Sequence, residues 1–176
     1  MALAARLVLT DCEKALEELN DCDVDLETSL SPMRRRRWMA IVALLRAVGH
    51  VLKNVDGASN PTLGRIIKAE WDAVTKTKPK PYILWEFIEN ERNTVLKEYR
   101  FRSHRRATGR GVTSISGVTA SGVATIKANK YGDAELRVLT DGPFAGRHDI
   151  AVVAEAIDWW RVYLDKIEAQ ESGVQT

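Results

Sequence analysis

The chain has 176 residues, which is the length of one ordinary domain with a sizeable core. Hydrophobic residues make up 45% of the chain and charged residues 28%, which excludes a disordered tail or a fibre. The formal net charge of +2 is too small to indicate a nucleic-acid partner by itself.

The distribution of charge, the cysteines and the apolar runs indicate in which compartment the protein is found. Residues 1–30 carry eight acids and two bases, so an acidic arm could attract the basic remainder, although a solvated acidic helix face explains the same pattern. Cys12 and Cys22 form no disulfide framework and no CxxC pair, which is typical of a reducing cytoplasm. The longest strongly apolar run, residues 38–45, is too short to cross a bilayer. We therefore expect a cytoplasmic protein with no membrane partner.

Apolar residues at three- and four-residue spacing predict five helices. These helices cover residues 3–20, 32–56, 61–77, 82–101 and 149–170. Ser31 and Asn60 are expected caps, and Pro32 and Pro61 suit the first helical position, where no backbone N–H is needed. Gly57 is the expected end of the second helix.

Residues 107–146 have a different pattern, with seven of the eleven glycines and several short alternating runs. They predict two paired strands at 122–128 and 134–140, and 112–118 is a candidate third strand. The expected fold is therefore mainly α. It is a single domain over residues 1–176, an antiparallel four- or five-helix bundle with a β-hairpin or three-stranded insertion before the last helix. A lone hairpin is not stable alone, so it must pack on the bundle or on another chain.

The fourth predicted helix carries the most informative residues. Arg92 interrupts its apolar face, and Asn93 and Lys97 lie in the adjacent row. Burying a guanidinium group is costly unless it is paired, so Arg92 needs an acidic partner or an anionic ligand. Glu91 and Glu155 are the candidate acidic partners.

The run Arg92-Asn93-Thr94-Val95-Leu96-Lys97 resembles the Arg-polar-x-x-x-His motif of the HEPN superfamily, with Lys97 in the histidine position. The resemblance extends loosely to a bundle outline at residues 3–106 and 149–170, and the wider run over residues 91–99 looks like bacterial HEPN-like proteins of uncharacterised function. It implies a ribonuclease that needs no metal or other cofactor and that often joins two motifs in one cleft of a homodimer. In that chemistry arginine grips phosphate and histidine transfers protons. Lys97 keeps a charge but is a poor base, which favours phosphate binding over cleavage.

His50 is the candidate for the missing proton-transfer group. It follows Arg46 by one turn on the second predicted helix, and both would face Arg92 if that helix packs on the fourth. Gly49 would let another helix approach closely, at a cost of ~1 kcal/mol in helix propensity. The alternative is a surface or half-buried histidine held by a backbone carbonyl.

Two basic clusters are candidates for a nucleic-acid surface. Residues 34–37 precede the second apolar stripe, and a second cluster follows the fourth helix. The nucleic-acid-binding candidates are Arg34, Arg37, Arg46, Arg100, Arg102, Arg105 and Arg106. The helix dipole favours cations at a C-terminus and disfavours them at an N-terminus, so residues 34–37 are the more suggestive of phosphate contact. A solvated basic turn is the alternative.

The sequence indicates no other chemistry: its histidines and cysteines lack metal-ligand spacing, and it has no P-loop or nucleophile elbow. We expect an RNA- or nucleotide-binding homodimer that is a metal-independent endoribonuclease or a degenerate form of one. In it Arg92 grips phosphate, Asn93 orients that contact, Lys97 stabilises charge and His50 transfers protons. The alternative is a non-catalytic interaction module, in which Arg92 is a structural ion pair.

Overall fold

A computed structural model describes residues 3–21, 31–107, 117–119, 122–124 and 135–174. The helices are α1 (Ala4–Asp21), α2 (Pro32–Val51), α3 (Gly57–Ser59), α4 (Pro61–Lys76), α5 (Asn90–Glu98) and α6 (Asp149–Val174), and two π-helical segments are η2 (Leu52–Asp56) and η3 (Ile83–Glu89). The chain is mainly α-helical, as expected. Of the two cysteines only Cys12 lies among the described residues, where it is buried in α1.

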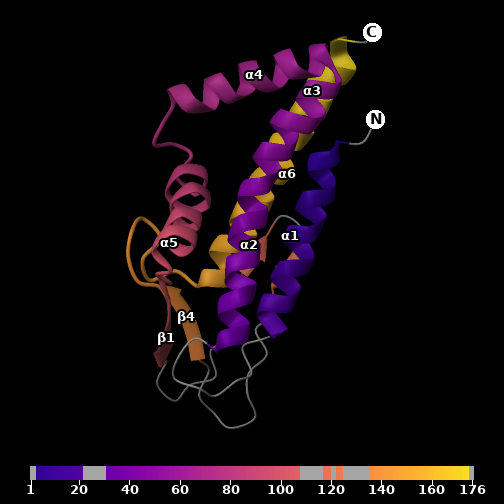
Figure 1. Ribbon diagram of the computed structural model, residues 1–176. Helices are drawn as coiled ribbons and strands as arrows, with labels where there is room; N and C mark the ends of the chain where they lie inside the picture. Colours follow the sequence, from indigo (N-terminus) through magenta and orange to yellow (C-terminus); the bar gives the residue numbers. More distant parts are fainter. Residues whose placement is uncertain (1–2, 22–30, 108–116, 120–121, 125–134, 175–176) are drawn as a thin grey trace.

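The long helices lie lengthwise beside one another. Figure 1 shows α1 and the η3–α5 unit running opposite to α2 and α6, with α4 crossing one end of the bundle. α1 packs on both α2 and α6, and α2 packs on η3 and α5. The antiparallel helical bundle predicted from the apolar spacing is therefore present, and its helices share one core.

The core forms where the predicted apolar stripes meet. Trp38, Phe87 and Trp160 are its largest apolar side chains, and all three are almost fully buried. Gly49 lies beside Trp160, because a Cβ atom built on Gly49 would be 2.8 Å from a ring carbon of that tryptophan. The close approach expected at Gly49 is therefore confirmed, and the partner is α6.

The predicted helix starts are confirmed by their caps. The hydroxyl of Ser31 accepts a hydrogen bond from the backbone N–H of Arg34 at 3.2 Å. The side-chain oxygen of Asn60 accepts from the N–H groups of Thr62 at 3.0 Å and Leu63 at 3.3 Å. Each cap satisfies backbone donors that have no partner inside the helix.

Two predicted helix ends are wrong. The second helix does not stop at Gly57 but continues through η2 and α3 to Ser59. The buried Asp56 of η2 accepts hydrogen bonds from the N–H groups of Ala4 at 2.7 Å and Ala5 at 3.0 Å, which caps α1. The fourth helix ends at Glu98 rather than at residue 101, because Tyr99 adopts a left-handed conformation with φ 51°.

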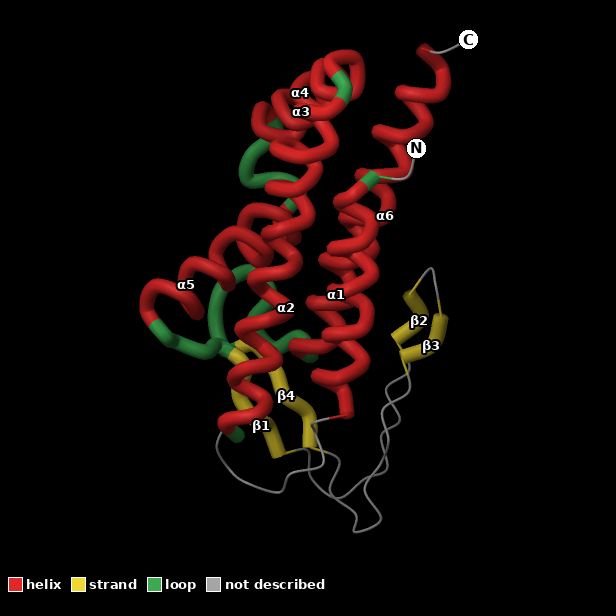
Figure 2. The backbone as a smooth tube through the Cα atoms, turned by 45° about the vertical axis from the view of Figure 1, so that its right-hand side comes forward, coloured by secondary structure: helices red, strands yellow, loops and turns green. Residues whose placement is uncertain are grey.

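The β pairing differs from the prediction. β1 (Ser103–Ala107) pairs antiparallel with β4 (Glu135–Leu139), and β2 (Gly117–Thr119) pairs antiparallel with β3 (Gly122–Ala124). The segments predicted to pair with each other therefore belong to two separate sheets, which Figure 2 shows apart. Residues 108–116, 120–121 and 125–134 of the predicted strands and of their connections lie outside the described residues. Both β2 and β4 contact α6, so the two sheets pack on the bundle as expected.

The continuous helix over Pro32–Ser59 is more apolar than its short runs suggested. Its most apolar stretch has a mean hydropathy of 1.3 and is 33% buried, so by length and composition alone it passes the test for a membrane span. The core helices of many soluble proteins pass the same test. The expectation that no segment is long and apolar enough is wrong for this helix.

Candidate functional site

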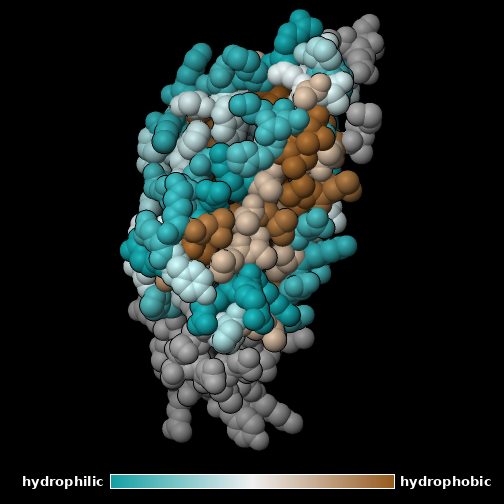
Figure 3. Space-filling view, viewed as in Figure 1, coloured by the Kyte–Doolittle hydropathy of each residue, from teal (hydrophilic) through white to brown (hydrophobic). Residues whose placement is uncertain are grey.

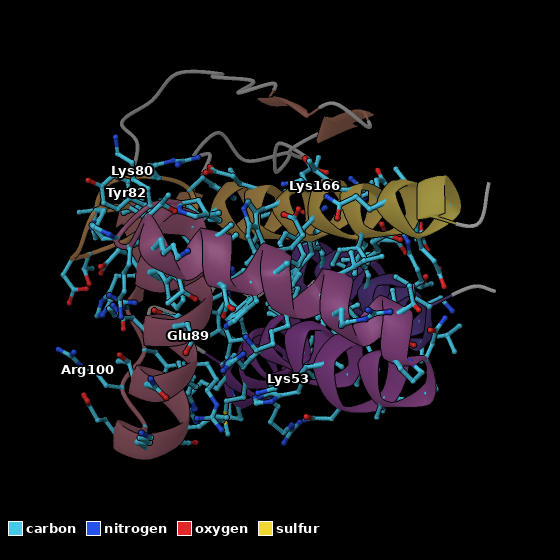
Figure 4. All side chains as sticks on the ribbon, turned by 90° about the horizontal axis from the view of Figure 1, so that it is seen from above. Lys53, Lys80, Tyr82, Glu89, Arg100 and Lys166 are labelled. Carbon is cyan, nitrogen blue, oxygen red and sulfur yellow. The ribbon has the colours of Figure 1, made fainter. Side chains whose placement is uncertain are left out.

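The packing of α2 on η3 and α5 brings together charged residues that are far apart in the sequence. Arg46 forms an ion pair with Glu89 of η3, with 3.1 Å between the guanidinium nitrogen and the carboxylate oxygen. The charges of Arg46, Lys53, Glu89 and Arg92 all act on the imidazole of His50. We call Arg46, His50, Lys53 and Arg92 the basic cluster, and Figure 4 shows Lys53 on η2 and Glu89 on η3.

The surroundings of His50 favour its neutral form. Partial desolvation is the main cause that lowers the pKa of His50 below 6.5, and the positive charge of Arg46 is the next. Arg92 and Lys53 lower this pKa further, whereas Glu89 raises it. At neutral pH His50 is therefore an exposed imidazole with a nitrogen free to accept a proton, set among permanent cations.

Arg92 is half-buried and has a neutral partner. Its guanidinium donates a hydrogen bond to the side-chain oxygen of Asn93 at 3.1 Å. Neither predicted acidic partner holds it, because Glu91 pairs with Arg102 and Glu155 pairs with Arg147. Among the described residues no carboxylate forms an ion pair with Arg92, which leaves its positive charge available to an anion.

Lys97 does not join the basic cluster. It is exposed in the last turn of α5, and it makes no hydrogen bond or ion pair with another described residue. Of the four predicted catalytic residues, Arg92 bonds to Asn93 and its charge acts on His50, whereas Lys97 is exposed one helical turn after Asn93 and makes none of these contacts. Lys53 and Glu89 were not predicted as site residues, although Lys53 follows His50 by three positions and Glu89 precedes Arg92 by three, which is regular helical spacing.

Two π-helical segments flank the basic cluster. η2 begins two residues after His50, and η3 ends three residues before Arg92. π-helix makes up well under 1% of residues in proteins and is frequent at functional sites. η2 also positions the Asp56 cap of α1, so its geometry serves the fold as well as the site.

Arg34 is a structural residue, so its predicted role in nucleic-acid binding is wrong. It is 1% exposed and forms a buried ion pair with Asp149 at 2.7 Å, which joins the start of α2 to the start of α6. Its guanidinium also donates to the carbonyl oxygen of Leu19 at 3.2 Å. Arg37 of the same turn is partly exposed and bonds to the carbonyl oxygen of Glu18.

Arg102 is also held inside the protein. It is 12% exposed, and its Nε atom lies 2.6 Å from the carboxylate of the fully buried Glu91, which accepts a second hydrogen bond from the Trp38 indole at 2.9 Å. Asp141 binds the other edge of the guanidinium at 3.1 Å. Arg102 is therefore a structural cation, and the prediction that it contacts nucleic acid is wrong.

The other arginines of the second cluster lie at the surface or on a strand. Arg100 is 60% exposed and pairs loosely with Glu98 at 3.4 Å and with Asp141 at 3.9 Å. Arg105 and Arg106 lie on β1, where their backbones pair with β4, and their side chains are outside the described part of the structure.

A surface cavity lies away from the basic cluster. It has a volume of about 620 Å³ and is formed by the turn before η3, the loop before α6 and the first half of α6. Three of its ten lining residues are aromatic, namely Tyr82, Phe144 and Trp159. Trp159 stacks on Tyr163 with 5.2 Å between ring centroids. Both residues belong to α6, so this stack lies along one helix.

Compared with protein-family models, with curated proteins and with solved structures, the chain matches none. Within the described residues there is also no group of three or more histidine, cysteine, aspartate or glutamate side chains that could hold a metal ion. The arrangement of the basic cluster therefore carries the functional proposal.

Proposed function

We propose that this protein binds RNA phosphate at the basic cluster and cleaves the RNA there without a metal ion. The observation that supports this most strongly is an exposed His50 whose pKa is lowered by partial desolvation and by the charges of Arg46, Arg92 and Lys53. Cleavage of RNA by its own 2′-hydroxyl needs a base and positive charge around the phosphate, and this cluster supplies both.

Arg92 and His50 have different roles in the proposed cleavage reaction. Arg92, with Asn93 fixing one edge of its guanidinium, donates to the phosphate oxygens and stabilises the charge that gathers there. His50 takes the proton of the 2′-hydroxyl as the 2′-oxygen attacks phosphorus. The bond from phosphorus to the 5′-oxygen breaks, and the leaving oxygen takes a proton from water. The products are a 2′,3′-cyclic phosphate and a 5′-hydroxyl end.

The test is cleavage of a mixed fluorescent RNA pool in EDTA by purified protein. Wild-type protein is expected to produce fragments with cyclic phosphate ends, and Arg92→Ala and His50→Ala are expected to lose this activity. Arg65→Ala and His104→Ala are matched controls, because each removes an exposed side chain of the same type elsewhere. Circular dichroism shows whether each variant is folded.

The outcomes separate binding from catalysis. Loss of cleavage in both site variants, with unchanged controls, supports the proposal. Cleavage that persists in His50→Ala shows that the activity belongs to another group or to a contaminant. If the folded wild-type protein binds RNA but leaves it intact at high concentration, the catalytic half of the proposal fails and phosphate binding remains.

We also propose that the protein forms a homodimer through the outer face of α2. Figure 3 shows apolar residues gathered in a band over α2 and its neighbours. Met33 and Val55 are 46% and 51% exposed, and Leu7 of α1 is 71% exposed. An uncovered apolar face of this kind marks an interaction surface, and a second copy is the partner that is always present.

The dimer is tested by light scattering during gel filtration. Wild-type protein is expected to run as a dimer and Val55→Glu as a monomer. Val162→Glu is the control, because Val162 is 68% exposed on α6, where it lines the surface cavity. A monomeric wild-type protein contradicts the homodimer. A dimer without RNA binding would instead favour the non-catalytic interaction module.

A further inference from the structure

The surface cavity between the start of η3 and α6 is separate from the proposed phosphate site. None of the described residues that line it belongs to the basic cluster, and Figure 4 shows Tyr82 of the cavity well apart from Lys53 of that cluster. Its volume of about 620 Å³ lies within the ~300–1,000 Å³ that is typical of small-molecule sites. The lining of the cavity therefore deserves to be compared with the chemistry of possible ligands.

Trp159 is held in place by other rings and can act as a stacking surface. The ring of Tyr163 lies nearly parallel to its indole, at an interplanar angle of 16° and 5.2 Å between centroids, and the Trp160 ring meets the indole edge-on at 4.7 Å. Both supporting rings are buried, whereas Trp159 is half-buried and borders the cavity. Tyr82, which is 46% exposed, adds a second ring from the turn before η3. A planar ligand that enters the cavity therefore meets a rigid aromatic surface of the kind on which nucleobases stack.

The charged groups that line the cavity already have partners of opposite charge. The guanidinium of Arg147 pairs with the carboxylate of Glu155 at 2.6 Å. Asp158 pairs with Arg161 of the same helix, and Arg161 pairs also with Glu13 of α1 at 2.6 Å. A strongly charged ligand, such as a phosphate or an ammonium ion, therefore meets no free counter-charge here. An uncharged ligand still meets N–H donors of the arginine and acceptor oxygens of the carboxylates.

We propose that this cavity binds a nucleobase, either of a free nucleoside or of a single-stranded RNA. A nucleobase is planar, is uncharged at neutral pH and has hydrogen-bond donors and acceptors on its edges. The indole of Trp159 stacks on the face of the base, and the ring of Tyr82 adds a second aromatic contact. Arg147 donates to the acceptors of the base, and Glu155 and Asp158 accept from its N–H groups. This proposal does not rest on the phosphate site, because the two sites share no described residue.

The test is a titration of the full chain with each of the four ribonucleosides, followed by NMR. The signals observed are the indole N–H of Trp159 and the backbone amide of Val162, which also lines the cavity. At least one nucleoside is expected to shift both signals to saturation, and ribose alone is expected to shift neither. Its 5′-monophosphate should bind within about twofold of that nucleoside, because a paired arginine gains little from a phosphate. Indole is the comparison ligand that has a flat ring without the edge of a base, and it should bind more weakly.

Variants of the two aromatic contacts locate the binding. Trp159→Leu should weaken nucleoside binding about tenfold, since stacking on one ring contributes roughly this factor, and Tyr82→Ala should weaken it severalfold. Trp71→Leu and Tyr99→Ala are the matched controls, because Trp71 is likewise half-buried and Tyr99 is likewise exposed, and neither lines the cavity. Tyr82→Ala keeps the test valid if Trp159→Leu does not fold, since Tyr82 is largely outside the core.

A single-stranded 2′-O-methyl oligonucleotide, which cannot be cleaved by its own 2′-hydroxyl, separates the two sources of the base. A base of RNA occupies the cavity if the oligonucleotide shifts the same two signals and Tyr82→Ala weakens that effect. A free nucleoside is the ligand if only nucleosides shift them.

Three results would overturn the proposal. They are unshifted signals with every nucleoside at the limit of its solubility, nucleoside affinities that the folded variants leave unchanged, and an affinity for indole equal to that for the nucleosides. Each of these leaves the phosphate site untouched. Conversely, a failure to cleave RNA in EDTA contradicts the proposed function without affecting nucleoside binding at the cavity.

Discussion

Replacing Arg102 with alanine should lower the free energy of unfolding by about 3–5 kcal/mol, because it leaves a buried carboxylate without its cation. Glu91 is 0% exposed, and Arg102 donates to it at 2.6 Å. In the variant the carboxylate keeps only the hydrogen bond from the Trp38 indole at 2.9 Å. The second contact of Arg102, with Asp141, contributes little of this, since Asp141 is 47% exposed and such pairs supply ~0.2–1 kcal/mol.

Urea denaturation followed by tryptophan fluorescence measures this loss. Arg100→Ala is the control, because Arg100 is 60% exposed and its removal should change stability by no more than ~0.5 kcal/mol. The double variant Glu91→Gln, Arg102→Met should recover most of the loss, since it removes both buried charges together. A loss below ~1 kcal/mol for Arg102→Ala, or an equal loss for Arg100→Ala, would refute the structural role of this pair.

Three further predictions follow from individual contacts. Gly49→Ala should lower the midpoint of urea unfolding, because the new Cβ atom would lie 2.8 Å from the Trp160 ring. The resulting strain of about 1–3 kcal/mol outweighs the ~1 kcal/mol that alanine gains in helix propensity. An unchanged midpoint contradicts the close contact. Burial raises the pKa of the Cys12 thiol to about 12, so peptide mapping should find it unmodified by iodoacetamide in native protein and modified after denaturation. An NMR titration of His50 should give a pKa below 6.5, and this pKa should be higher in Arg46→Gln, which lacks the positive charge that lowers it. Because the fold favours the neutral imidazole, the contribution of His50 to the free energy of unfolding should be complete above pH 6.5 and should be lost as the pH falls through the pKa of the folded protein.

The helices are predictable from sequence because their determinants are local. Apolar spacing reports which face a helix buries, and Asn60 followed by Pro61 reports where α4 starts. The end of the second helix is not local. Gly57 is a good stop, but the helix runs through it because η2 turns Asp56 onto the first amides of α1, which lie more than fifty residues away in sequence. A prediction from the residues near Gly57 therefore cannot include that contact.

The sheet was mispredicted for a related reason. β1 has the sequence Ser-His-Arg-Arg-Ala, which has no apolar alternation and therefore no strand signal. Its partner β4 begins at Glu135, so the pairing is set by contacts across a long insertion. A strand was correctly expected around residues 134–140, and its partner was sought among the nearest alternating residues, where it does not lie.

The sequence also did not predict which carboxylates pair with the arginines. Glu91 is adjacent to Arg92, but neighbouring residues on a helix point in different directions, and Glu91 instead faces inward to Arg102. The meeting of Arg46, His50 and Arg92 was predictable, because one-turn spacing puts the first two on one face and the packing of α2 on η3 and α5 supplies the third.

The contrast between the arginines supports the location of the proposed site. Arg34 and Arg102 are each matched by a carboxylate that is 0% exposed, so their charges are neutralised inside the fold. Arg92 is half-buried, yet its hydrogen-bond partner is the neutral side chain of Asn93. A guanidinium that has lost part of its water and has gained no counter-charge binds an incoming anion more strongly than a fully hydrated one does. Arg92 therefore provides what a phosphate requires, and His50 lies within its field.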